Sequence, residues 1–159
     1  MMALIQIAAG CLGTLGFSIL FHIRGKKLVF STLGGLISWA VFLGLEFLLP
    51  GEAVRYLITA AVITVYGEIL ARKEKTPTTT FLVPSVIPLI PGGALYYTMN
   101  YALNEQWSEF ARQAFYTLEL ALALAVGIIA VTTAVRLLSV WSAKRKNREH
   151  VPHFHHSIK

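Results

Sequence analysis

The residues best suited to bind a small polar molecule lie in a stretch rich in proline and glycine, residues 76–100, which reads TPTTTFLVPSVIPLIPGGALYYTMN. A proline removes a helical N–H donor and clashes with the preceding turn, so this stretch predicts two short helices joined by an unwound segment. The second helix would begin with free backbone N–H groups, which attract a carboxylate. The predicted substrate-binding residues are Pro88, Pro91, Gly92, Gly93, Tyr96 and Asn100. The alternative interpretation is a kink that serves only packing, which membrane-spanning helices tolerate.

A second candidate pair is Glu68 and Arg72, which stand four residues apart in an order that favours pairing on one helix face. Ionisable residues in an apolar segment can couple transport to protons or act as a gate, and we predict that role for this pair. An interfacial salt bridge is the alternative. Glu46 and Glu119 lie near the ends of apolar segments, where a carboxylate reaches water.

The chain carries no recognisable catalytic motif. It has no paired-carboxylate motif, no HExxH sequence and no Gly-x-Ser-x-Gly or Ser/Lys pattern, so we predict no catalytic residue and no enzyme. No set of carboxylates or cysteines accompanies His150, His153, His155 and His156, so we predict no metal site and no cofactor.

The composition indicates an integral membrane protein. Hydrophobic residues make up 55% of the 159 residues and charged residues 14%, whereas soluble domains carry about 25% charged residues. The net charge of +6 comes from short clusters between apolar runs without interleaved aromatic residues, a pattern that argues against nucleic-acid binding. Cys11 is the single cysteine and lies in an apolar run, so no disulfide framework is expected.

The apolar runs predict an all-α fold with five membrane-spanning segments in a domain of residues 1–142, followed by a basic, histidine-rich cytoplasmic tail, 143–159. The predicted segments are 2–21, 29–49, 53–71, 77–103 and 117–140, and the fourth is broken by its prolines and glycines. Residues 104–116 have apolar side chains at helical spacing, and they predict an amphipathic helix at the outer membrane surface.

The basic clusters predict the orientation. With five spans, Arg24/Lys26/Lys27, Arg72/Lys73/Lys75 and Lys144/Arg145/Lys146/Arg148 fall on one side. The positive-inside rule then places the N-terminus outside and the C-terminus in the cytoplasm. A re-entrant fourth segment would put the last cluster outside, so the pattern favours a full crossing. The start of the second half-helix would then lie near the middle of the membrane.

The sequence also resembles a known family. Glu68 and Ala71-Arg72 close one segment, Lys75-Thr76-Pro77, Phe81 and Pro84 follow, and Pro88-Leu89-Ile90-Pro91-Gly92 precedes Tyr96. This run is similar to the C-terminal half of the threonine/serine exporter family in its small stand-alone form. The resemblance implies a secondary-active exporter of threonine, serine or related metabolites in a prokaryotic cell membrane, coupled to the proton motive force, with Pro88, Pro91 and Gly92 in the carrier motif.

The resemblance also implies a partner, because fused members carry a related first half, preceded by a hydrophilic segment, on the same chain. A larger related membrane subunit is therefore expected, with the substrate site between two subunits of inverted topology and with membrane lipid around them. Self-association through small-residue faces is left open. The alternatives are a dicarboxylate (succinate-like) exporter subunit and a membrane assembly protein that does not itself transport.

Overall fold

The computed structural model describes residues 2–149 of the chain, with side chains from residue 4 to residue 141. Within that range the chain is entirely helical, which confirms the predicted all-α class. The elements are α1 (Met2–Leu20), α2 (Lys26–Glu46), α3 (Glu52–Lys73), α4 (Thr79–Val86), the 3-10 helix η1 (Ile87–Leu89), α5 (Gly92–Leu103) and α6 (Trp107–Glu149).

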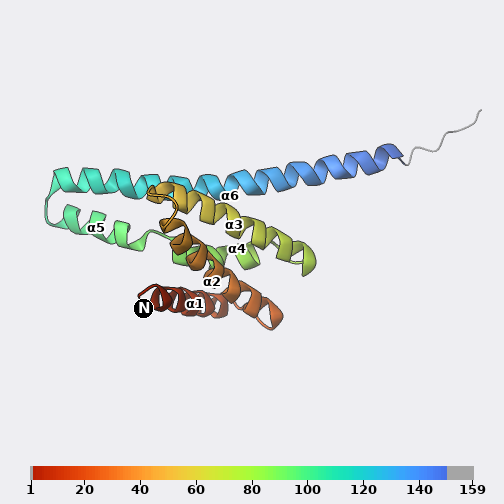
Figure 1. Cartoon of the computed structure of the whole chain (residues 1–159), viewed down its shortest axis with the longest axis horizontal. Helices are drawn as coiled ribbons and strands as arrows, with labels where there is room; N and C mark the ends of the chain where they lie inside the picture. The colour runs from red at the N-terminus through yellow and green to blue at the C-terminus, as the bar shows by residue number, and fades with distance from the viewer. Residues whose placement is uncertain (1, 150–159) are drawn as a thin grey trace, which may run out of the picture.

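The long helix α6 runs along one side of the molecule, and the other helices lie on one side of it (Figure 1). Helix α3 packs against it, α2 packs against α3, and α1 packs against α2. Helix α4 lies beside α2 and α3, whereas α5 packs against the first part of α6. Helices α1, α2 and α3 run in alternate directions between two ends of the bundle, α4 and α5 then run in one common direction, and α6 returns (Figure 1).

The helix ends follow from local sequence. Helix α2 begins after Gly25, whose φ of 65° is in the left-handed region that glycine adopts freely. Pro50 and Gly51 separate α2 from α3, as the sequence predicts. Helix α3 stops before a turn in which Lys75 has a φ of 47°, and Pro77 follows.

Helix α6 corrects one predicted boundary. The expected surface helix, 104–116, and the expected last span, 117–140, form a single helix that starts at Trp107. No proline or glycine interrupts the chain between Trp107 and Val126, so nothing ends the helix there. The helix also includes residues 143–149 of the predicted tail, and residues 150–159, with their histidines, lie outside the described residues.

The packing is of the kind expected in lipid. Small hydroxyl-bearing side chains are fully buried, while large apolar side chains on the outside are exposed, among them Leu4, Leu12 and Leu122. The buried hydroxyl residues with no exposed surface are Thr14, Ser18, Ser31, Ser38, Thr59, Thr64 and Ser85. Small and hydroxyl residues let membrane helices approach closely and bond across the contact, so this distribution fits a membrane protein.

Length and composition single out three helices of the described chain as able to cross a membrane, namely α2, α3 and α6. A fourth crossing is added if the bent pair of α4–η1 and α5 counts as one span, and α1 is a shorter apolar helix. The five-span arrangement therefore stays a prediction.

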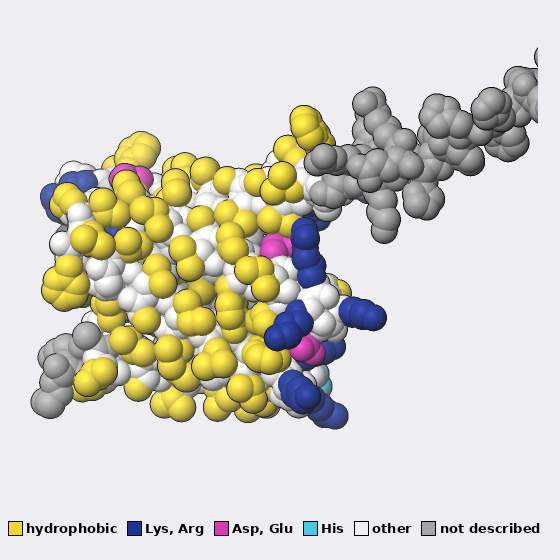
Figure 2. All heavy atoms as spheres, turned by 45° about the vertical axis from the view of Figure 1, so that its right-hand side comes forward, with side chains coloured by type: hydrophobic (Ala, Val, Ile, Leu, Met, Phe, Trp, Pro, Cys, Tyr) yellow, Lys and Arg dark blue, Asp and Glu magenta, His cyan; other side chains and the backbone are white. Residues whose placement is uncertain are grey.

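Basic side chains collect at one end of the bundle. Figure 2 shows most of the Lys and Arg side chains of that face at this end, beside a broad hydrophobic band. Arg24 of the α1–α2 loop and Lys27 on the first turn of α2 line one hollow with residues that follow Lys75, so two of the three basic clusters lie together. We call this the basic end, and α6 extends past it (Figure 1).

Candidate functional site

The chain breaks between η1 and α5. Ile90 is extended, with φ of −61° and ψ of 126°, because a residue before proline avoids the helical region. The axes of the helices on the two sides of the break differ by 53°, so the chain bends but does not turn back. This geometry agrees with a segment that continues from the basic end toward the other end.

The break leaves backbone donors free at the start of α5. The N–H of Gly92 donates to the carbonyl oxygen of Ile90 at 2.7 Å. The N–H groups of Gly93 and Ala94 make no hydrogen bond within the described part of the chain. The first N–H groups of a helix have no partner inside the helix, and together with the helix dipole they favour an anion.

These donors face a groove with a volume of about 410 Å³. Four elements besides the break contribute to it. The lining residues are Trp39 of α2, Glu52 and Tyr56 of α3, Pro88 and Ile90 to Ala94 around the break, Tyr97 of α5, and Gln113, Tyr116 and Leu120 of α6. A Cβ atom added at Gly92 or Gly93 would meet no heavy atom within 4 Å, so both glycines border open space.

Glu52 supplies a negative group to the same groove. It lies on the first turn of α3, and one of its carboxylate oxygens accepts a hydrogen bond from the hydroxyl of Tyr116 on α6. A carboxylate on the first turn also stabilises α3 itself through the helix dipole. The groove thus has a donor-rich end at the start of α5 and an acidic group from α3.

A cluster of aromatic rings packed edge to face lies behind Glu52. The rings of Trp39 and Phe42 meet edge to face at 5.6 Å, and those of Phe42 and Tyr56 at 4.9 Å between centroids. The guanidinium carbon of Arg55 lies 5.2 Å from the Phe42 ring centroid. Packed aromatic rings and a cation above them give the groove one rigid side.

The predicted substrate-binding residues divide into two groups. Pro88, Pro91, Gly92 and Gly93 line the groove. Tyr96 does not line it and has 65% of its surface exposed, whereas its neighbour Tyr97 does line it. Asn100 also lies outside the groove, and its side-chain oxygen accepts a hydrogen bond from Asn104 at 3.2 Å.

Glu68 and Arg72 form no ion pair in the structure, so the alternative interpretation as a salt bridge is not supported. A carboxylate oxygen of Glu68 instead accepts a hydrogen bond from the Thr78 hydroxyl at 3.1 Å, because the α3–α4 turn brings that residue within reach. Among the described side chains, the one ion pair is that of Arg112 with Glu109. Glu68 and Arg72 do share a small hollow of about 170 Å³ between α3 and α6.

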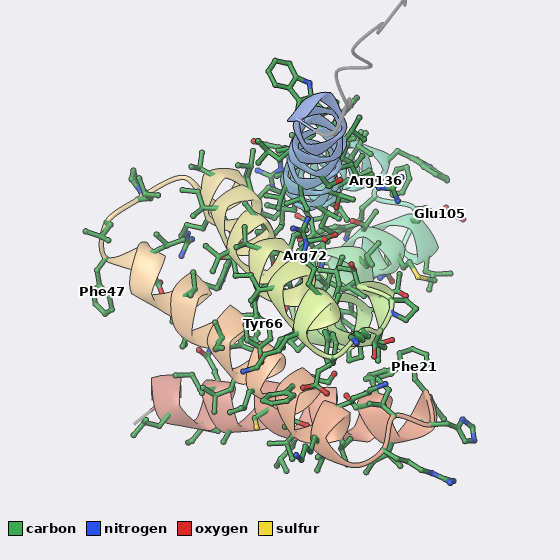
Figure 3. All side chains as sticks on the ribbon, turned by 90° about the vertical axis from the view of Figure 1, so that its right-hand side faces the viewer. Phe21, Phe47, Tyr66, Arg72, Glu105 and Arg136 are labelled. Carbon is green, nitrogen blue, oxygen red and sulfur yellow. The ribbon has the colours of Figure 1, made fainter. Side chains whose placement is uncertain are left out.

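The two predicted sites lie at opposite ends of α3. Glu52, in the groove, and Glu68 are separated by about 24 Å along the helix, from the usual rise per residue. Arg72 belongs to the end of the bundle that faces the viewer in Figure 3. The break therefore lies beside the first turns of α3.

The described residues hold no group of three or more His, Cys, Asp or Glu side chains that could bind a metal ion. The groove offers hydrogen-bond donors, one carboxylate and aromatic rings, and these groups suit reversible binding of a small charged molecule.

Comparison with protein families decides the class. The family described as "Threonine/Serine exporter, ThrE" matches residues 6–134 of the chain. This chain belongs to the threonine/serine exporter family. The match runs from α1 well into α6 and includes every residue of the groove.

No curated protein and no solved structure gives a match. Family membership and the apolar helices together indicate a multi-pass membrane protein of the transporter class. The sequence resemblance, which rests on residues 68–101, is confirmed, because the family match covers residues 6–134 of this chain.

Proposed function

We propose that the chain is a subunit of a secondary-active carrier that exports small carboxylate-bearing metabolites of the threonine and serine type. The observation that carries the proposal is the groove, in which free N–H groups of Gly93 and Ala94 and the carboxylate of Glu52 border one space. An amino acid carries a carboxylate and an ammonium group on the same carbon atom, and these charges complement the N–H groups and Glu52.

In this proposal the substrate carboxylate binds the N–H groups at the start of α5, and its ammonium group binds Glu52. The glycines allow the carboxylate to reach the backbone, since no side chain covers them. Charge-assisted hydrogen bonds of this kind are the stronger ones, contributing about 1.5–3 kcal/mol each. A dicarboxylate would bring its second carboxylate toward Glu52 and be repelled, so the groove favours amino acids over succinate.

A larger related subunit is proposed to complete the site. Helix α5 packs against α6 but has no fully buried residue, and its apolar side chains Leu95, Met99 and Leu103 are exposed. Exposed apolar side chains beside a groove suit either lipid or another membrane helix. The partner would cover the groove from this side, and carriers commonly place their sites between two repeats.

Proton coupling and orientation complete the proposal. Glu68 and Arg72, in their own hollow near the basic end, are assigned to gating or proton coupling, with Thr78 as the hydrogen-bond partner of Glu68. The basic end is placed in the cytoplasm of a prokaryotic cell and the N-terminus outside. Substrate would then leave the cell past the groove.

The proposal is tested by Glu52→Gln, with Glu46→Gln as the matched control. Glu46 is the last residue of α2 and does not line the groove. We expect Glu52→Gln to lower threonine and serine efflux by roughly tenfold, the loss of one charged hydrogen bond, and to spare succinate. Efflux is measured from loaded vesicles that hold this chain together with its partner subunit.

Two results would redirect the proposal. If Glu52→Gln and Glu46→Gln behave alike for threonine and serine, Glu52 does not bind the ammonium group. If the partner alone transports at the full rate when this chain is omitted, the chain is an assembly protein and not part of the carrier.

A further inference from the structure

A second hollow, at the basic end of the bundle, is lined by cationic and hydroxyl side chains. It has a volume of about 560 Å³ and lies between the α1–α2 loop and the start of α4. Its polar lining residues are His22, Arg24, Lys27, Thr76, Thr79 and Thr80. No Asp or Glu lines it, so its chemistry favours an anion.

Several donors of this hollow are free. The hydroxyls of Thr79 and Thr80 make no hydrogen bond within the described part of the chain, and neither does the N–H of Thr79, the first residue of α4. Arg24 and Lys27 take part in no ion pair among the described side chains. Ionic and neutral donors thus border the same space, which is the combination that phosphate groups use.

The loop that carries Arg24 and leads into Lys27 of α2 is held in a defined shape. His22 and Gly25 have left-handed φ values of 58° and 65°. The N–H of Ile23 donates to the carbonyl of Ser18 at 3.0 Å, and that of Leu28 to the carbonyl of Gly25 at 3.1 Å. These backbone bonds fix the loop, so its backbone loses less freedom when a ligand binds.

One side of the hollow is apolar and open to the outside. Phe21, Ile23, Val83 and Pro84 line it, and Phe21 and Val83 have 48% and 43% of their surface exposed. Figure 3 shows Phe21 at the margin of the helices. A ligand that fits this hollow therefore carries an anionic group and an apolar chain side by side.

We propose that this hollow binds the phosphate group of an anionic phospholipid, with an acyl chain along Phe21 and Val83. Anionic lipids are enriched on the cytoplasmic side, and basic pockets between membrane helices bind their head groups. The site is separate from the substrate groove; it rests on the proposed orientation of the basic end but not on the proposed transport.

The test uses the purified full-length chain in detergent, titrated with phosphatidylglycerol or phosphatidylcholine of identical acyl chains and followed by native mass spectrometry. We expect phosphatidylglycerol to bind in preference to phosphatidylcholine. Arg24→Gln with Lys27→Gln should weaken that binding by roughly thirtyfold, since each of the two basic residues contributes about 1 kcal/mol. The matched control is Lys26→Gln with Lys73→Gln, which removes the same charge from positions outside the hollow and should leave binding unchanged.

Other outcomes would overturn the proposal. Equal losses in both double variants would mean diffuse attraction to the basic end. Complete displacement of phosphatidylglycerol by millimolar inorganic phosphate would mean a small-anion site and not a lipid site. If the Arg24/Lys27 variant does not fold, Thr79→Val with Thr80→Val keeps every charge, and unchanged binding by that variant would contradict the assignment.

Discussion

Two pairs of adjacent glycines in this chain have opposite surroundings. In α2, a Cβ atom at Gly34 would overlap Ser85 of α4, and one at Gly35 would overlap Thr14 of α1. At the start of α5, a Cβ atom at Gly92 or Gly93 would meet nothing within 4 Å. The first pair lets three helices touch, whereas the second pair leaves room beside free backbone donors.

The hydroxyl groups follow the same division. In the contact of α1, α2 and α4, Ser18 and Ser31 bond each other at 2.9 Å, and Ser85 donates to the carbonyl of Phe81 at 2.7 Å. The polar groups of this contact are satisfied by the protein itself. The N–H groups of Gly93 and Ala94 are not. The comparison teaches that glycine marks a close contact in one place and a ligand site in another, depending on what lies opposite.

The largest expected effect comes from replacing one glycine of each pair with valine. We expect Gly35→Val to reduce the free energy of unfolding by about 3 kcal/mol, because the added atoms overlap Thr14 in a closed contact. Gly93→Val should change stability by much less. Thermal unfolding of the two variants in the same detergent measures the difference, and equal losses would abolish the distinction between the pairs.

A bulky residue in the groove should affect transport and not stability. We expect Gly92→Leu to lower threonine and serine efflux by at least about tenfold, because the side chain covers the donors that bind the carboxylate. Gly44→Leu is the matched control, since Gly44 also borders open space but lies outside the groove. Efflux is measured with the partner subunit present and expression equal. Unimpaired efflux by Gly92→Leu would remove the groove from the transport path.

The smallest effect is expected from a hydroxyl in the closed contact. Ser18→Ala removes the bond to Ser31, and such bonds between membrane helices contribute about 0.6 kcal/mol on average. Stability should fall by that amount while efflux stays unchanged. A clear loss of efflux at full stability would show that the closed contact takes part in transport.

The sequence predicts much of this fold because its signals are local. Apolar runs predict α2 and α3, and Pro50-Gly51 predicts the turn between them. The prolines and glycines after α4 predict the break, and four of them line the groove, namely Pro88, Pro91, Gly92 and Gly93. The continuous α6 differs from the prediction because the change from an amphipathic to an apolar pattern indicates a helix boundary, although no residue there breaks a helix.

The rest of the site depends on contacts between distant segments. Glu52 and Tyr116 are 64 residues apart, and nothing in either neighbourhood reveals that they meet. Tyr97 replaces Tyr96 in the groove because adjacent residues of a helix point in different directions, about 100° apart, and only packing against α6 sets which of them faces inward. Glu68 bonds Thr78 across a turn, a contact that helical spacing cannot predict.

The binding of substrate at the start of α5 is tested most directly by protecting a cysteine placed there. Gly93→Cys is made in a Cys11→Ser background, which leaves a single thiol beside the free donors, and Gly44→Cys serves as control. The rate of alkylation is measured in vesicles containing the partner subunit, with and without saturating threonine or serine. We expect substrate to slow alkylation of Gly93→Cys at least about tenfold, by covering the groove, and to leave Gly44→Cys unaffected. An alkylation rate at Gly93→Cys that saturating substrate does not change would contradict binding at this groove.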